Sequence, residues 1–424
     1  MFLGLFAGLA AAFLVGGVTG TLAQYAPPLG PTSPHSKKTP SRSERGYPLG
    51  AWLFYPGLFA GTVYNSNVDQ TETGRVSSWG LRLVPRFTAE LDNGIHRSKA
   101  YGLMDFQHYS KSSASEQTQL DAKVGVTHSY EAQRDVTLRF SGDFTRQTDV
   151  FGGSSFVAPD SALAATAGQT SYAVSPQISP ERYNQFSSSV SAQKNFNRAF
   201  VSGGFSIQHL VFDSDPIAGN RDGTIYSLNQ RTGFYVTPQV YAFVDPTLDW
   251  RRYENSARDS DGYRVTAGLG TQNQGLWQGE IFGGYQAEKN DTVGTYDSVV
   301  LGLRVLYSPT RMLTLRATVD QSLGASSISG TSGTATRVTS ALLNVGYNGL
   351  PQGWTANGRL GYVHTDFVNS SRNDDGWLVG ANLSYLIWRN FGVTLDYQYK
   401  TVDSNVAGQS FDQHMVSLGA SYKY

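Results

Sequence analysis

From Ala51 to the last residue, apolar and polar side chains alternate along one run after another, and each run of eight to fifteen residues ends at a turn signal. Between Phe391 and Lys400, every second residue from Phe391 to Tyr399 is apolar or aromatic, and Asp396 lies among the residues between them. A period of two places these two sets on opposite faces of a β-strand. The pattern therefore predicts a chain of amphipathic strands, each with one apolar and one polar face.

Two kinds of connection alternate between these runs. Short turns such as Asp92-Asn93-Gly94 and Arg389-Asn390 alternate with longer polar loops, of which 147–183 is the longest. Short turns at one end and long loops at the other are typical of outer-membrane barrels, with the short side in the periplasm. The predicted strands are 51–64, 77–91, 95–109, 120–130, 136–146, 184–194, 199–213, 225–236, 239–253, 263–272, 277–286, 297–307, 311–323, 337–349, 354–366, 376–388, 391–402 and 411–424.

The fold class that follows is all-β, a transmembrane antiparallel up-and-down β-barrel of about eighteen strands over residues 51–424. A miscount by one hairpin would give sixteen strands or twenty, and sixteen is the alternative. A sandwich or propeller also has one-sided apolar faces, but here nearly every run is amphipathic in the same way. Closing the barrel removes the free edges that a sandwich of this size would leave.

The first fifty residues differ from the rest of the chain. Residues 1–23 are predicted to be a signal peptide, because an apolar stretch from Phe2 to Gly17 is followed by small residues and a cleavage position after Ala23. No Lys or Arg precedes the apolar stretch, so an uncleaved anchor is the alternative. Residues 24–50 are rich in Pro, Ser and Thr and are predicted to be an extended periplasmic linker, or else a docking arm for a periplasmic partner.

The stretch from His414 to Tyr424 is an amphipathic strand that ends on an aromatic residue. It resembles the C-terminal signal strand of outer-membrane β-barrels, in which a glycine precedes two aromatic positions. Gly419, Tyr422 and Tyr424 fill those places. The resemblance implies that these three residues form an assembly signal for the barrel assembly machinery, with the aromatic side chains facing outer-membrane lipid.

Composition limits the possible functions. Charged residues make up 16% of the chain, and 33 Lys and Arg balance 33 Asp and Glu, so no net positive field favours a nucleic-acid partner. The absence of cysteine excludes a disulfide framework, thiolate metal sites, a Cys nucleophile and a lipoprotein anchor. The 46 glycines, 24 tyrosines and 22 phenylalanines are expected of many short strands with an aromatic girdle.

The polar faces of the strands are the predicted functional surface, because an eighteen-strand barrel is wide enough for an aqueous lumen. The charged residues on these faces are positive and negative in nearly equal numbers, whereas a strongly ion-selective pore needs a ring of charges of one sign. The mixture favours neutral or zwitterionic solutes, unless the charges merely pair across strands in a wet interior. Asp245, Asp249 and Arg251 share one strand face and are the best candidates for a constriction wall. The predicted lumen-lining residues are Arg82, Arg86, Asp105, Lys123, Arg139, Asp143, Asp245, Asp249, Arg251, Arg264, Arg304, Arg316, Asp320, Arg359, Asp396 and Lys400.

The longest loop is a candidate constriction. In porins an external loop at the same place folds into the lumen and narrows it, and this likeness is one of position only. Phe151, Phe156 and Tyr172 are the constriction-loop candidates, because aromatic rings in a polar loop offer a stacking surface for sugars. A surface loop without this function is the alternative.

Catalytic and metal motifs are missing from the sequence. The seven histidines are scattered without HExxH spacing, and no Gly-x-Ser-x-Gly segment occurs. Asp259-Ser260-Asp261-Gly262 lacks the distal Glu of a Ca²⁺ loop and is interpreted as a turn. We therefore predict no catalytic residue, no metal and no cofactor. The alternative, an outer-membrane enzyme, predicts a tight cluster of Ser, His and Asp at the extracellular rim.

Two segments resemble a known family. Leu53-Phe54-Tyr55-Pro56-Gly57-Leu58 and Tyr64-Asn65-Ser66-Asn67-Val68 resemble the opening of the putative β-barrel porin type 2 family, and Arg251-Arg252-Tyr253 with the segment 259–264 resembles its middle. The resemblance implies an outer-membrane barrel, associated in some members with exopolysaccharide export. The function expected from it is a channel for hydrophilic solutes, with a polysaccharide or small saccharide and periplasmic export components as partners. A barrel whose lumen is plugged is the further alternative.

Overall fold

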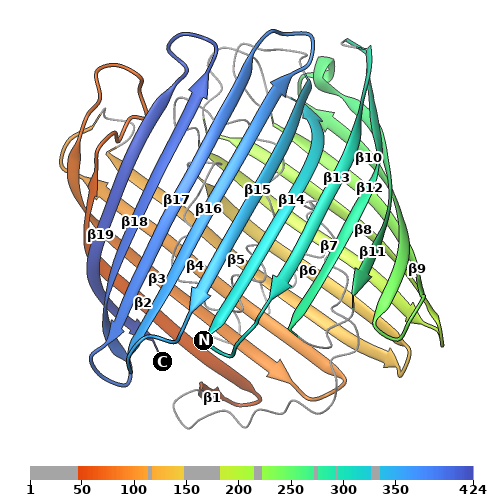
Figure 1. Cartoon of the computed structure of the whole chain (residues 1–424), viewed down its shortest axis with the longest axis horizontal. Helices are drawn as coiled ribbons and strands as arrows, with labels where there is room; N and C mark the ends of the chain where they lie inside the picture. Colours follow the sequence, from red (N-terminus) through yellow and green to blue (C-terminus); the bar gives the residue numbers. More distant parts are fainter. Residues whose placement is uncertain are drawn as a thin grey trace.

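A computed structural model describes residues 46–112, 117–147, 182–213, 222–271, 276–292, 294–325 and 335–423. Nineteen strands form one antiparallel sheet, and the last eighteen close into a barrel (Figure 1). The strands of the barrel are β2 (Trp52–Asn65), β3 (Ser78–Asp92), β4 (His96–Tyr109), β5 (Thr118–Gln133), β6 (Val136–Gln147), β7 (Tyr183–Asn195), β8 (Ala199–Phe212), β9 (Gly223–Tyr235), β10 (Val240–Tyr253), β11 (Ser260–Thr271), β12 (Trp277–Asn290), β13 (Gly294–Tyr307), β14 (Leu313–Ala325), β15 (Ala335–Tyr347), β16 (Trp354–Phe367), β17 (Asn373–Leu386), β18 (Phe391–Ser404) and β19 (Phe411–Lys423).

The predicted fold is confirmed. Each strand pairs with its neighbours in sequence, and the ring closes where β19 pairs with β2. Within the described residues, no helix is long and apolar enough to cross a membrane. A 3₁₀ turn, η2 (Ser256–Arg258), precedes β11.

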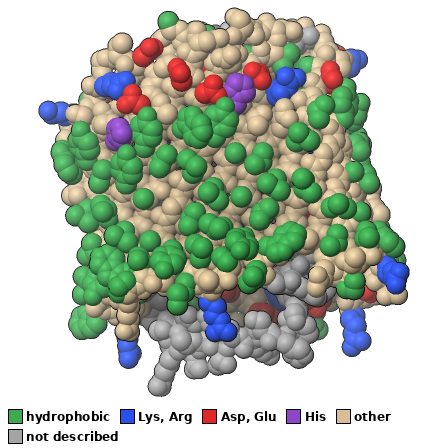
Figure 2. Space-filling view, in the orientation of Figure 1, with side chains coloured by type: hydrophobic (Ala, Val, Ile, Leu, Met, Phe, Trp, Pro, Cys, Tyr) green, Lys and Arg blue, Asp and Glu red, His purple; other side chains and the backbone are tan. Residues whose placement is uncertain are grey.

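The alternation of side chains explains the two surfaces of the wall. On β18, Val393 and Leu395 face outward and are exposed, whereas Asp396 and Lys400 face inward and are buried. Hydrophobic side chains cover the visible outer wall in a broad band, and charged and histidine side chains gather above it (Figure 2). An apolar outer band and a polar interior are the arrangement of a lipid-facing barrel.

The strands extend further at the long-loop end than predicted. The predicted strand 277–286 continues in the structure to Asn290, because Lys289 and Asn290 pair with Asp261 and Ser260 of β11. Both faces of the strands carry polar residues at this level, so the alternation ends before the hydrogen-bonded ladder does.

One short strand lies outside the ring. β1 (Tyr47–Leu49) falls within the predicted linker and pairs with the beginning of β2, where Leu49 stands opposite Trp52. β19 ends its pairing with β2 at Gly57, so β1 covers the stretch of β2 beyond that point. The predicted signal peptide and residues 24–45 of the predicted linker lie outside the described residues.

Side chains hold the closing seam at the long-loop end. His414 donates its backbone N–H to the hydroxyl of Ser66 at 2.8 Å, and the Gln413 amide donates to the carbonyl of Asn67 at 2.8 Å. An ion pair joins Arg75 and Asp412 at 2.6 Å. The first and last strands are therefore joined by side chains beyond the end of their ladder.

The middle of this seam is a close approach of two backbones. Gly419 stands opposite Gly61, and a Cβ atom on Gly419 would lie 2.4 Å from the carbonyl oxygen of Ala60. A substituent there would push the two strands apart. Gly419, predicted as part of the assembly signal, thus has a steric reason to be glycine in the closed barrel.

We expect Gly419→Val to impair closure of the barrel, because the added carbons meet the β2 backbone. The measurement is the fraction of heat-modifiable, folded protein on a gel after refolding into vesicles. Ala420→Val is the matched control, since Ala420 is the adjacent residue of the same seam and lies on the outward face. A Gly419→Val protein that folds as completely as the Ala420→Val protein would contradict this role of Gly419.

Candidate functional site

The inner face of the barrel carries the candidate site. The registers extend this face from strand to strand around the ring, and all sixteen residues predicted to line the lumen lie on it. Their use as a channel lining stays a prediction. What the structure adds is their grouping, which depends on pairs far apart in sequence.

The first group lies beside the closing seam. Arg82 and Asp105 form an ion pair of 2.6 Å with exposed fractions of 6% and 1%. Arg82 also donates to the hydroxyl of Ser417 on β19 at 3.0 Å, and Gln107 donates to Asp105 at 3.2 Å. This group joins β3 and β4 to the last strand across β2. It therefore helps to close the barrel and also makes the interior polar beside the seam.

The second group lies on the opposite wall, near the short turns of β9, β10, β12 and β13. Arg231 pairs with Asp245 at 2.7 Å and with Glu280 at 3.1 Å. Arg304 reaches the same Glu280 carboxylate at 3.5 Å, and the Tyr241 hydroxyl donates to it at 2.5 Å. One carboxylate therefore serves two guanidinium groups and a phenol.

Aromatic rings form a layer beneath these arginines. The Arg231 guanidinium lies 4.2 Å above the centroid of Phe243, and that of Arg304 lies 4.9 Å above the centroid of Phe282. A Cβ atom on Gly302 would meet the Phe282 ring at 2.0 Å, so this ring lies flat on the glycine of the next strand. Such cation–π stacking adds about 0.5–2 kcal/mol and keeps the rings against the wall.

The third group lies towards the long loops. Arg251 forms an ion pair with Glu288, which also accepts from the Tyr296 hydroxyl at 2.7 Å. Arg264 pairs with Asp320 at 3.3 Å.

These pairs change the view of the predicted constriction wall. Asp245, Asp249 and Arg251 do share one face of β10, but Asp245 bonds Arg231, Asp249 accepts from Ser227 at 2.6 Å and Arg251 bonds Glu288. They are engaged along the wall in three separate interactions. This arrangement is the cross-strand pairing that the sequence left open as the alternative.

The remaining predicted lining residues lie on the same face outside these groups. Asp396 accepts from the Asn382 amide, Arg139 donates to Gln193 at 3.3 Å, and Arg86 packs over Gly57. The others stand in register on the inner face at these positions: Lys123 opposite Thr145, Asp143 opposite Ser187, Arg316 and Arg359 on either side of Asn344, and Lys400 opposite Gln413.

An uncharged lane separates the charged groups. The inward residues of β7 include Gln185, Ser187, Ser189, Ser191 and Gln193, and none of them is charged. On β8 the facing positions include Ser202, Gly204, Ser206 and Gln208, again without charge. Between residues 185–193 of β7 and 202–208 of β8, two adjacent strands therefore present mainly hydroxyl and amide groups to the interior.

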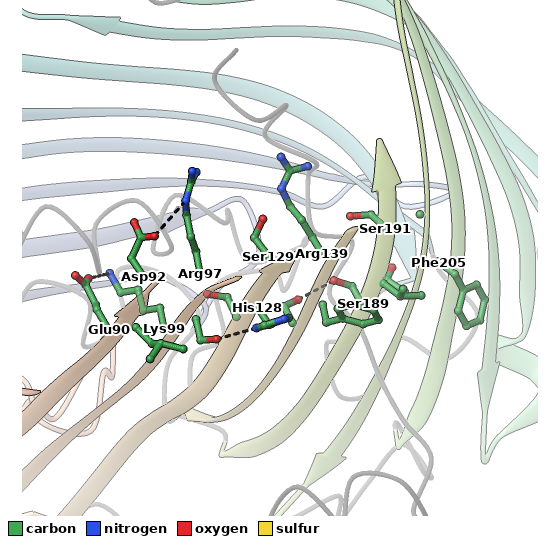
Figure 3. Close-up of a pocket in the computed structure, with 18 of the residues that line it drawn as sticks. Glu90, Asp92, Arg97, Lys99, His128, Ser129, Arg139, Ser189, Ser191 and Phe205 are labelled. Atoms are coloured by element: carbon green, nitrogen blue, oxygen red, sulfur yellow. Dashed lines mark hydrogen bonds and ion pairs between the residues drawn. The ribbon is translucent and has the colours of Figure 1, made fainter. Parts of the chain in front are cut away.

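A cavity of about 490 Å³ adjoins this lane near the short-turn end. Ser129, Arg139, Ser189, Ser191 and Asn229 contribute to its lining. The ion pairs Glu90–Lys99 at 3.3 Å and Asp92–Arg97 at 3.7 Å lie at its side, and Arg97 and Arg139 project from the strands into the interior (Figure 3). Charged and hydroxyl groups thus face one space.

Of the remaining predicted site residues, those of the assembly signal and the constriction loop, the structure describes only some. Tyr422 faces outward and its ring lies 5.0 Å from that of Phe391. Phe151, Phe156, Tyr172 and Tyr424 lie outside the described residues.

Sequence reasoning missed Arg231 and Phe243 as members of the site. Arg231 lies at an inward position of its run, so alternation alone identifies it. Phe243 is an apolar residue on the inner face, where it stacks with Arg231 and packs in a buried cluster with Phe200, Tyr241, Phe282 and Val300. Among the described residues no group of three or more His, Asp or Glu has the arrangement of a metal site.

Comparisons with known proteins found a matching family model and several similar solved structures. A family model described as "Putative beta-barrel porin 2" matches residues 40–424. The outer-membrane protein OpdK of Pseudomonas aeruginosa, crystallised with vanillate, is 12% identical over 88% of this chain and 99% of its own, with a TM-score of 0.43. The ferric enterobactin receptor PfeA of the same organism, as a Q482A mutant with enterobactin, is 7% identical over 87% and 81%, with a TM-score of 0.41. The likeness to these two structures says nothing about the solute, and no curated protein matches the chain.

We expect Arg82→Ala to destabilise the barrel by about 3 kcal/mol, because it leaves the Asp105 carboxylate buried and unpaired. Urea unfolding in vesicles, followed by tryptophan fluorescence, measures the free energy of unfolding. Arg75→Ala is the matched control, since the Arg75–Asp412 pair has exposed fractions of 46% and 32% and should be worth less than about 1 kcal/mol. If the two variants lost the same free energy of unfolding, burial would not strengthen the Arg82–Asp105 pair and the prediction would be wrong.

Proposed function

The chain belongs to the putative beta-barrel porin 2 family, a family of porin-like outer-membrane barrels, and from this membership we propose that it is a channel for hydrophilic solutes through a water-filled, mixed-charge lumen. The proposed solutes are neutral or zwitterionic, with saccharides first among them. The fold is consistent with a bacterial outer-membrane protein, and the proposed location is the outer membrane with the short turns in the periplasm.

The observation that carries this proposal is the division of the inner face into paired charges and an uncharged lane. In each of the three groups, acidic and basic side chains form pairs. The other predicted lining charges also include both signs, so the described interior is of mixed charge, whereas strong ion selectivity needs a ring of one sign. The lane on β7 and β8 offers hydroxyl and amide groups, which donate and accept hydrogen bonds as sugar hydroxyls do. A solute that exchanges its hydrogen bonds to water for hydrogen bonds to these groups loses little free energy on entry.

Exopolysaccharide export is the finer version of this proposal and is supported by the family resemblance of residues 53–58 and 251–264. Its partners would be outer-membrane lipid, the barrel assembly machinery and periplasmic export components. A plugged structural barrel is the competing proposal. An outer-membrane enzyme is less well supported, because the contacts that it needs are not together. His364 bonds Asp375 and Asp366 near the long loops, whereas the hydrogen bond between Ser98 and His128 lies near the short turns.

Planar-bilayer recording of the purified protein tests the channel. We expect a current with nearly equal cation and anion permeability that falls when an oligosaccharide is added. The absence of any open-state current, with or without the oligosaccharide, would contradict the channel and favour the plugged barrel.

The lane is tested by adding charge to it. Ser189 and Ser206 stand opposite each other, so Ser189→Asp with Ser206→Asp places two carboxylates in the lane. We expect the permeability ratio to shift towards cations and the oligosaccharide block to weaken. Ser189→Asn with Ser206→Asn is the matched control, because it changes size without charge. Selectivity that is unchanged in the Asp variant would show that solutes do not pass along β7 and β8.

A further inference from the structure

The pairing of β13 with β14 stops halfway up the wall. The two strands pair from Tyr307↔Leu315 to Gly302↔Asp320 and no further, although both continue towards the long loops. β14 remains paired with β15 as far as Ala325↔Ala335. The other strand pairs around the ring keep their ladders over most of their length, so this interval is a local opening of the sheet. We call it the β13–β14 gap, between residues 295–301 of β13 and 321–325 of β14 (Figure 1).

β14 bends into the barrel above Asp320. The backbone carbonyl of Leu323 accepts from Gln286 of β12 at 3.3 Å and from Arg251 of β10 at 3.4 Å. The N–H of Leu323 donates to Gln286 at 3.3 Å. These bonds reach across the inner side of β13, so β14 at Leu323 is held against the inner wall rather than beside β13.

Side chains take the place of the missing ladder. Arg337 of β15 donates to the hydroxyl of Ser298 at 2.9 Å and to the carbonyl of Asp297 at 3.2 Å. Gln321 donates to Ser298 at 3.4 Å. Three polar side chains therefore close the gap, and each bond between them can break without unfolding a strand.

The gap faces the apolar part of the outer surface. Val299 and Leu301 point outward there, and both are 61% exposed. A free strand edge beside lipid leaves backbone groups without water or partner, and barrels normally avoid it. An edge retained at this level calls for a functional reason.

Apolar side chains continue through the gap to the interior. Leu323 is 1% exposed and packs with Tyr296, Ala335 and Val368 on the inner side. Tyr296 and Val300 lie on the same face of β13, and Val300 belongs to the cluster of Phe200, Tyr241, Phe243 and Phe282. Two apolar clusters thus lie on this part of the wall, one at the gap and one further down, with Ser298 of β13 between them. The pairs Arg251–Glu288 and Arg264–Asp320 lie beside them.

We propose that the β13–β14 gap is a lateral portal, through which the acyl chain of a single-chain amphiphile with a zwitterionic or neutral head passes between the lumen and the outer leaflet. The apolar cluster at the gap and the one below it receive the chain, and the paired charges beside them suit a head without net charge. Opening requires loss of the Arg337, Gln321 and Ser298 contacts while the ladder below Gly302 stays intact. This passage is separate from the axial channel and does not depend on it.

The test uses a reversible bridge across the gap. The chain has no cysteine of its own, so Ser298→Cys with Gln321→Cys can be joined by a disulfide or a short bifunctional thiosulfonate. Val379→Cys with Tyr399→Cys is the matched control, because these residues stand opposite each other on an intact outward ladder. Gel mobility before and after heating confirms that each bridged barrel is folded.

The probe is nitroxide-labelled lysophosphatidylcholine in vesicles that contain the protein, followed by electron paramagnetic resonance. We expect a strongly immobilised component with the unmodified chain and with the bridged control. Lipid bound to the outer wall contributes part of this immobilised component in every variant. Bridging the gap should reduce the component to that contribution, and a thiol reductant that opens the bridge should restore the rest. An immobilised component that is the same with the gap bridged and reduced would overturn the portal.

Hydrogen exchange supplies an independent measurement on the unmodified protein. The backbone amides of residues 295–301 that point towards β14 should exchange faster than those of residues 377–383 at the same end of the intact β17 ladder. Equal protection of the two segments would show that the gap stays closed and would also overturn the proposal. Neither readout uses conductance, so a failure of the axial channel and a failure of the portal are distinguishable.

Discussion

A backbone amide that faces hydrocarbon has no water to bond, and the whole architecture depends on this constraint. It favours pairing of the strands on both edges, to which the β13–β14 gap is the exception, and it requires the last strand to meet the first. At that meeting two glycines face each other, Gly61 and Gly419, and Arg82 reaches across β2 to Ser417. The inner charge group beside the seam is therefore part of closure as well as part of the lumen wall.

The same constraint separates the two faces of the wall. Once the ladder satisfies the backbone, the outer side chains are selected for lipid and the inner ones for water and for each other. On the inner face, several charges pair with one another, as in the sharing of Glu280 of β12 by Arg231 of β9 and Arg304 of β13. The interior therefore combines charged groups and buried apolar clusters with the lane on β7 and β8, which carries no charge.

The strands, their number and their two faces were predictable because alternation is a local property, as the run from Phe391 to Lys400 shows. Strand ends were less predictable where both faces are polar, as at Asn290 of β12. The charge groups were not predictable, because the partner of Arg231 lies 49 positions away and is determined by the registers of three intervening pairs of strands. The bend of β14 has no signature in the alternation at all, since it depends on hydrogen bonds that Leu323 makes with its backbone.

The seam also has a consequence for how the chain reaches its final form. Ser66 and His414, which bond across the seam, are separated by 348 positions. Every other pair of neighbouring strands in the ring joins segments that follow each other in the chain. Bringing such distant segments together carries the largest loss of chain entropy in the molecule, and contacts of this kind form slowly. Until the final strand has been made, the growing sheet keeps two open edges, and β1 covers only three residues of one of them. The time between synthesis of the first hairpin and closure is therefore the period in which this chain most needs protection from aggregation.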